Sequence, residues 1–232
     1  MDPLRVLNLY VHIGAGIAGI AVGIAILFRL KGTPWHRNYG RIFAICVLIV
    51  SATAALASIF FRFRPLLVVL TVLTLYQLVS GWRSVRNKQA GPAAFDAVWT
   101  LAAIATTILL LPILISAPTH GSRQPVVVFS TLGALALVLA YDALRWLFPR
   151  RWFATLWAYE HTYKLIASFA ALLSAFAGNV IRFGQPWSQI LPSALGTLLI
   201  FWYFLRLAQH QEKLIPRSDG DLVSLSKSIP PG

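Results

Sequence analysis

Three ionisable residues lie within little more than one helical turn of an otherwise apolar stretch, residues 152–180. Glu160, His161 and Lys164 are followed by Ser168, four residues further on. On a helix, residues three and four apart are neighbours, so these side chains share one side. A carboxylate, an imidazole and an amine in one place can hold a small polar solute. They can also take up a proton, because histidine titrates near neutral pH.

The composition indicates that these residues lie in a membrane protein. Of 232 residues, 58% are hydrophobic and 12% are charged, about half of the roughly 25% charged residues usual in soluble domains. A bilayer core is crossed by about 20 apolar residues, and seven segments qualify: about 8–29, 39–60, 65–82, 94–116, 125–147, 154–180 and 188–208. The first is too long for a signal peptide and is interpreted as a retained helix. The predicted fold class is therefore all-α.

The predicted architecture is a polytopic integral membrane protein, with residues 1–210 forming a single bundle of seven transmembrane helices. Residues 211–232 are polar and are expected to be a disordered cytoplasmic tail. Fourteen of the twenty Lys and Arg residues flank one side of the segments, which places the N-terminus outside and the C-terminus in the cytoplasm. The inner membrane is the expected location, with the lipid bilayer and anionic headgroups at the cytoplasmic face as partners. This distribution also accounts for the net charge of +13 without nucleic acid.

The favoured function is a non-enzymatic one: binding or moving a small solute, proton or lipid through a polar interior centred on the sixth helix. The predicted ligand or proton site is Glu160, His161, Lys164 and Gln77. Gln77 belongs to a polar stripe on the third helix that suits interhelical hydrogen bonds: Thr71, Thr74, Gln77 and Ser80. A plainer alternative remains open. Counting about 20 residues back from the end of the sixth segment puts the membrane boundary near His161, where Glu160 and Lys164 would form an ordinary surface pair.

Other polar residues give weaker expectations. His12, His36, Arg37 and Arg41 are interpreted as a second polar site or, equally, as basic and aromatic residues at the membrane boundary. Asp142 and Arg145, one turn apart, are expected to pair at the cytoplasmic interface. Small residues on the first helix predict close helix packing within or between chains, so a homo-oligomer is open: Ala15, Gly19 and Gly23.

Several short motifs carry a family resemblance: His12, Lys31-Gly32, His36-Arg37, Gly40-Arg41, Ser80-Gly81-Trp82-Arg83, Asp96 and His161. With these residues the chain resembles an uncharacterised bacterial family of predicted membrane proteins, the domain of unknown function 2306 family. That resemblance covers most of residues 8–208 and implies only a multi-helix membrane protein.

A fainter likeness is to transmembrane cytochrome b reductases, in which histidines at helix ends hold haem. It implies an alternative function, electron transfer by a membrane oxidoreductase with haem b between imidazole pairs. The candidate ligands are His161 with His36 or His210, and His12 with His120. The sequence assigns no other cofactor or metal. Catalytic zinc needs three protein ligands, and no segment offers two histidines, or a histidine and an aspartate, at i, i+4. The seventh segment lacks a lysine for retinal, and Cys46 is the only cysteine.

Overall fold

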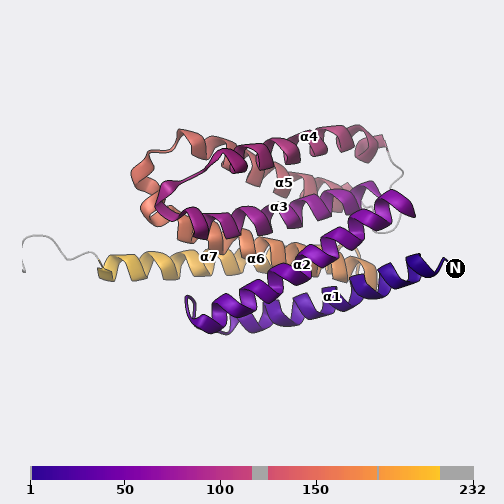
Figure 1. Cartoon of the computed structure of the whole chain (residues 1–232), viewed down its shortest axis with the longest axis horizontal. Helices are drawn as coiled ribbons and strands as arrows, with labels where there is room; N and C mark the ends of the chain where they lie inside the picture. The colour runs from indigo at the N-terminus through magenta and orange to yellow at the C-terminus, as the bar shows by residue number, and fades with distance from the viewer. Residues whose placement is uncertain (1, 117–124, 182, 215–232) are drawn as a thin grey trace, which may run out of the picture.

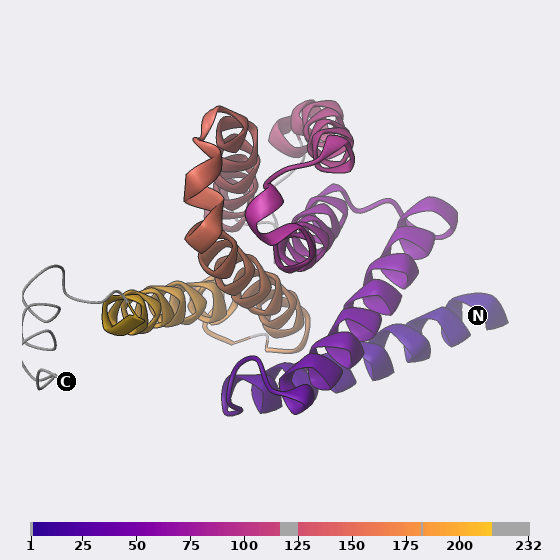
Figure 2. The same cartoon turned by 60° about the vertical axis from the view of Figure 1, so that its left-hand side comes forward.

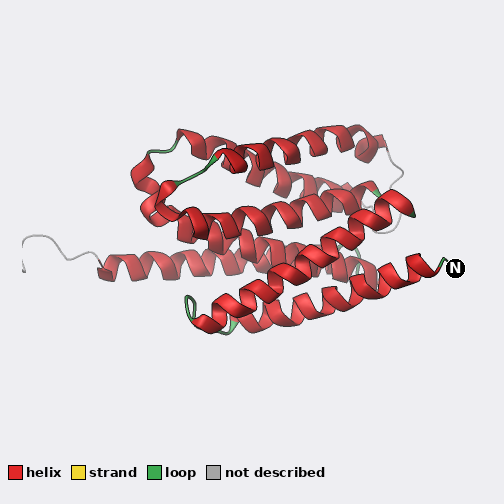
Figure 3. Ribbon diagram, in the orientation of Figure 1, coloured by secondary structure: helices red, strands yellow, loops and turns green. Residues whose placement is uncertain are grey.

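Seven long helices form a bundle in the computed structural model, which describes residues 2–116, 125–181 and 183–214 (Figures 1 and 3). They are α1 Pro3–Leu27, α2 Pro34–Phe60, α3 Pro65–Asn87, α4 Ala94–Ser116, α5 Pro125–Leu144, α6 Phe153–Val180 and α7 Trp187–Leu214. Short 3₁₀ helices follow α3 and α5: η1 Lys88–Ala90, η3 Arg145–Leu147 and η4 Arg150–Trp152. All seven long helices have the length and apolar composition needed to cross a bilayer. The prediction of an all-α bundle of seven such helices is confirmed.

The structure corrects the predicted bounds at several helix ends. The first helix begins at Pro3, five residues before the expected start. The second helix begins at Pro34, because Thr33 caps it by accepting a hydrogen bond from the backbone nitrogen of His36; His36 and Arg37 thus lie in its first turn rather than in a loop. The third helix runs five residues past the expected end, to Asn87. The seventh reaches Leu214, so residues 211–214 are helical. The rest of the predicted tail, residues 215–232, lies outside the described residues.

α6 is the central helix of the bundle. Figure 2 shows it between α7 on one side and the α1–α2 hairpin on the other, and α3 packs along it. Glycines on three neighbouring helices let α6 side chains approach their backbones. A Cβ added at Gly23 would lie 2.3 Å from Phe169, one at Gly81 2.3 Å from Leu165, and one at Gly196 2.6 Å from Ala170. Small residues of α1 therefore serve packing inside the chain.

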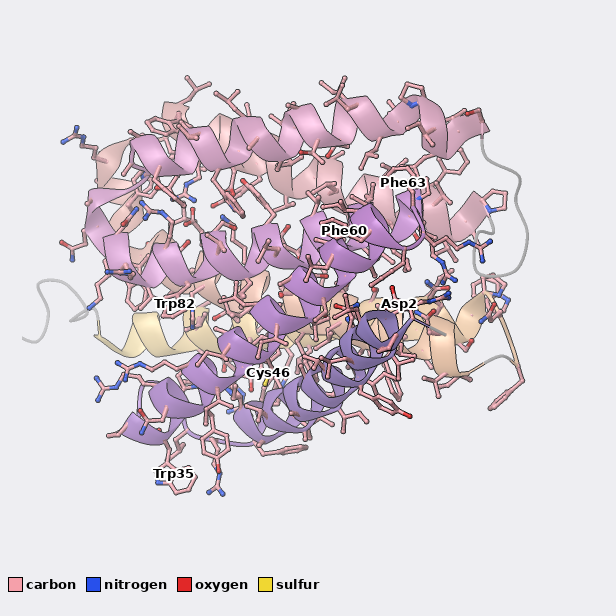
Figure 4. The ribbon with its side chains drawn as sticks, turned by 45° about the vertical axis from the view of Figure 1, so that its right-hand side comes forward. Asp2, Trp35, Cys46, Phe60, Phe63 and Trp82 are labelled. Atoms are coloured by element: carbon pink, nitrogen blue, oxygen red, sulfur yellow. The ribbon has the colours of Figure 1, made fainter. Side chains whose placement is uncertain are left out.

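Buried apolar side chains form two clusters. One joins α3, α4 and α5 around Tyr76, Leu135 and Val138, and the other joins α2, α3 and α6 around Val47 and Phe169. The outward faces are also apolar, above all on α1 and α7, whose most apolar windows are only 11% and 6% buried. Trp35 and Phe60 project from opposite ends of α2 (Figure 4), where aromatic residues suit the two boundaries of a bilayer.

Candidate functional site

Four charged side chains meet in the interior of the bundle and are called the ion-pair network below: Asp142 at the end of α5, Arg145 in η3, and Glu160 and Lys164 in α6. Their exposed fractions are 3%, 4%, 3% and 0%. Lys164 Nζ lies 2.6 Å from Asp142 Oδ1. Arg145 Nη1 bridges the two carboxylates, 3.3 Å from Asp142 Oδ1 and 3.4 Å from Glu160 Oε2. Two positive and two negative groups leave the network with no net formal charge.

Hydroxyl groups complete the coordination of both carboxylates. Tyr76 of α3 donates to Asp142 Oδ2 at 2.6 Å, while Tyr141 of α5 donates to Glu160 Oε1 at 2.8 Å. Ser84 of α3 donates to Glu160 Oε2 at 2.9 Å. All four carboxylate oxygens therefore have partners, the condition under which buried charges are tolerated. The network also ties α3 to α5 and α6.

The sequence left two interpretations of Glu160 and Lys164 open: a buried polar site or an ordinary surface pair. Glu160 and Lys164 are buried in the protein rather than exposed on its surface, and Lys164 pairs with Asp142 on another helix instead of with Glu160 one turn away. The expected pair of Asp142 and Arg145 forms and is buried in the protein; its place at the cytoplasmic interface stays a prediction. An embedded charge is stabilised most by partners that surround it, and neighbouring helices supply more of them than one helix face does.

His161 stands apart from the ion-pair network although it follows Glu160 directly. Its Nδ1 lies 3.1 Å from the carbonyl oxygen of Gly81 on α3. Its ring meets that of His36 edge-on, with centroids 6.2 Å apart and planes at 82°. The predicted trio is therefore divided between two places, with the histidine facing the first turn of α2.

The polar stripe on α3 does not form the hydrogen bonds expected of it. Thr71 and Thr74 donate to carbonyls one turn back in their own helix, each at 2.8 Å, because a threonine in a helix easily reaches them. Only the backbone of Thr74 joins α6, accepting a bond from Ser168 at 2.9 Å. Gln77 is 3% exposed, and its Oε1 has no hydrogen-bond partner among the described residues.

The second predicted polar site divides as well. His12 Nδ1 lies 2.8 Å from the hydroxyl of Thr53, near the C-terminal end of α2. His36 is seventeen residues nearer its start, about 25 Å away along the helix. Arg37 and Arg41 are exposed near His36. Of the expected haem pairs, the structure brings together only His36 and His161; His120 and the side chain of His210 lie outside the described part.

A recess adjoins the ion-pair network between α3, α4 and η3. It is lined by Tyr76, Ser80, Pro92, Asp96, Trp99, Thr100, Asp142, Arg145 and Trp146. Three buried polar atoms at this recess have no hydrogen-bond partner in the described part of the chain: Ser80 Oγ, Trp99 Nε1 and Arg145 Nε. Asp96 is held by Arg83, whose Nη2 lies 3.2 Å from Oδ2, and by Asn87 and the backbone of Ala93.

Sequence reasoning missed the hydroxyl partners Tyr76, Tyr141, Ser84 and Thr100. One signal was available: Asp142, at the end of an apolar segment, supplies the negative charge that an embedded Lys164 requires. The described residues contain no group of three or more His, Cys, Asp or Glu placed to hold a metal. No protein-family model matches the chain, and no curated protein or solved structure is significantly similar to it.

Proposed function

We propose that the chain is an integral membrane protein whose polar interior, centred on α6, binds or moves a small polar species, either a proton or a solute. The observation that carries this proposal is the burial of Asp142, Arg145, Glu160 and Lys164, each at most 4% exposed, among seven helices of membrane-spanning length. Ionisable groups inside a membrane are costly, and they commonly mark a pathway or a proton site.

The distribution of basic residues supports an orientation with the N-terminus outside and the C-terminus in the cytoplasm. Nine exposed Lys and Arg residues belong to the end of the bundle that holds the α1–α2 turn: Arg29, Lys31, Arg37, Arg41, Arg86, Lys88, Arg150, Arg151 and Arg206. Three described ones belong to the opposite end: Arg5, Arg62 and Arg64. The richer end suits the cytoplasmic face and its anionic headgroups, which supports a location in the inner membrane.

This proposal is tested by infrared difference spectroscopy of the purified protein in detergent, recorded as the pH is lowered. A network that takes up a proton gives a protonated-carboxyl band, which Asp142→Asn or Glu160→Gln removes. The chain has only seven Asp and Glu residues, so the band can be assigned with few variants. Asp2→Asn, at an exposed residue, is the matched control and leaves the network band in place. A band that survives both network variants contradicts the proposal.

A second candidate function is electron transfer through haem, favoured by the edge-on approach of His36 and His161. The bond between His161 Nδ1 and the Gly81 carbonyl leaves the other ring nitrogen free to bind a metal, as outer hydrogen bonds of ligating histidines do. A visible spectrum of the purified protein tests this candidate. A Soret band that shifts on reduction with dithionite and is lost in His161→Ala supports it, and its absence from protein expressed with sufficient haem rejects it.

A further inference from the structure

We infer that the species exchanged at the ion-pair network is a proton, and that it passes to solvent at one end of the bundle only. The route is a hydrogen-bonded chain from Thr100 through Tyr76 to Asp142. This inference rests on the proposed function and specifies both its substrate and the side from which that substrate is exchanged.

The chain of hydroxyl groups has the geometry that proton transfer requires. Thr100 Oγ1 lies 2.8 Å from the Tyr76 hydroxyl, which donates to Asp142 Oδ2 at 2.6 Å. Thr100 Oγ1 also donates to the Asp96 carbonyl at 2.8 Å, so its proton has to turn from that carbonyl to Tyr76 during transfer. When Asp142 is protonated, the Tyr76 proton moves to Oδ2, the tyrosine oxygen receives the Thr100 proton, and Thr100 receives one from solvent. The net change is one proton taken from solvent and one carboxylate neutralised, with both hydroxyl groups restored.

The outer end of this chain lies at the recess. Thr100, Tyr76 and Asp142 all line it, together with Trp146 of η3, which is 47% exposed. Ser80 and Arg145 are each 4% exposed, and each has an unpartnered polar atom there. Buried polar atoms are normally satisfied by protein or water, so these atoms can hold solvent once the surrounding aromatic side chains shift. A shift of those side chains would open the recess between the network and the end of the bundle near η1 and η3.

On α3 to α6 the other half of the bundle holds no acidic or basic side chain, and the hydroxyl groups of Thr71, Thr74 and Thr131 there donate to carbonyls of their own helices. Residues 65–82 of α3, 97–116 of α4, 125–141 of α5 and 165–180 of α6 contain no Asp, Glu, His, Lys or Arg. Their interior is filled by buried apolar side chains: Leu66, Val69, Leu70, Leu73, Leu110, Leu114, Val127, Val128, Leu135 and Val138. From Tyr76 to Leu66 this seal runs for about 15 Å along α3. Exchange is therefore expected at the recess end alone.

A proton fits the network better than a molecular solute does. Every carboxylate oxygen already has a partner, so a solute would have to displace protein groups, whereas a proton needs only a shift within existing hydrogen bonds. The charged and titratable groups around Asp142 come from five elements. Four of these supply Tyr76 and Arg83 of α3, Asp96 of α4, Tyr141 of α5 and Arg145 of η3. α6 adds Glu160, Tyr163 and Lys164. Neutralising Asp142 leaves Lys164 without its carboxylate partner, so proton uptake alters the contact between α5 and α6.

Variants of the hydroxyl chain test the route. In detergent, Tyr76→Phe and Thr100→Val are expected to slow the rise of the Asp142 carboxyl band after a pH jump roughly tenfold or more, because each removes one link. Tyr163→Phe removes a neighbouring tyrosine hydroxyl that is not in the chain and should leave the rate unchanged. Circular dichroism and gel filtration confirm that each variant is folded. An unchanged rate in both chain variants refutes the route.

Vesicles that hold uniformly oriented protein test from which end of the bundle the proton is exchanged. Acid added on the face that carries η1 and η3 should produce the carboxyl band at once. Acid on the other face should produce it only after a protonophore is added. An equal response from both faces refutes one-ended exchange but leaves the proposed function intact. A band missing already in detergent, where both ends meet solvent, refutes the assignment of a proton and leaves a solute as the only form of the proposed function.

Discussion

Replacing Lys164 should be among the most destabilising single changes in this chain. Lys164 is fully buried, and its Nζ lies 2.6 Å from Asp142 Oδ1. Lys164→Met keeps the unbranched side chain but removes the charge, so two carboxylates share Arg145 as their one remaining cation. Leaving one member of a buried ion pair uncompensated costs about 3–5 kcal/mol. We expect a loss of that size in the free energy of unfolding.

The double variant Lys164→Met with Asp142→Asn separates charge from packing. Asn keeps the shape of the carboxylate without its charge, so the second change should recover about 2 kcal/mol of the first, as contacting residues commonly show. Unfolding by sodium dodecyl sulfate in mixed micelles, followed by circular dichroism, measures Lys164→Met, Asp142→Asn and the double variant. Lys88→Met, at an exposed lysine, is the matched control and should stay within about 0.5 kcal/mol of the parent.

Two results would refute this reasoning. One is a cost for Lys164→Met no larger than that of Lys88→Met, which would mean that the Lys164 amine is solvated in the folded protein. The other is strict additivity in the double variant, which would mean that Lys164 and Asp142 do not interact.

The same unfolding assay checks two glycine variants, for which opposite signs are expected. Gly81→Ala places a Cβ 2.3 Å from Leu165 Cδ2 and 2.8 Å from Lys164 Cβ, and should cost about 1–3 kcal/mol through overpacking of α3 against α6. Gly133→Ala, on α5, meets nothing within 4 Å and should stabilise the protein by up to about 1 kcal/mol, because alanine favours a helix over glycine. A destabilised Gly133→Ala would show that α5 has close neighbours there.

The positions of the helices could be predicted from the sequence because a segment of about 20 apolar residues indicates a helix of membrane-spanning length, whatever its neighbours are. The predicted starts at residues 65 and 154, for example, are within one residue of Pro65 and Phe153. Other bounds were predicted less accurately. Thr33 caps α2 before its apolar part begins, and α3 continues through the basic residues after residue 82. Orientation and membrane insertion remain predictions.

The site was harder to predict because its contacts join residues far apart in the chain. Lys164 and Asp142 are 22 residues apart, and Tyr76 and Asp142 are 66 apart. Helical spacing identifies neighbours only on one helix, so it suggested Glu160 with Lys164 and missed the partners across the bundle. It also grouped His161 with this pair, although the histidine contacts α3 and the first turn of α2.

The buried pairing of Lys164 has a consequence for biosynthesis. A lysine near the middle of an isolated helix opposes insertion by about 2.5–3.5 kcal/mol, and the carboxylate that compensates it, Asp142 of α5, precedes it in the chain. Lys164 is therefore synthesised only after Asp142, which accepts its hydrogen bond. If α6 were synthesised first, Lys164 would have no carboxylate partner; as the sixth helix, it follows Asp142.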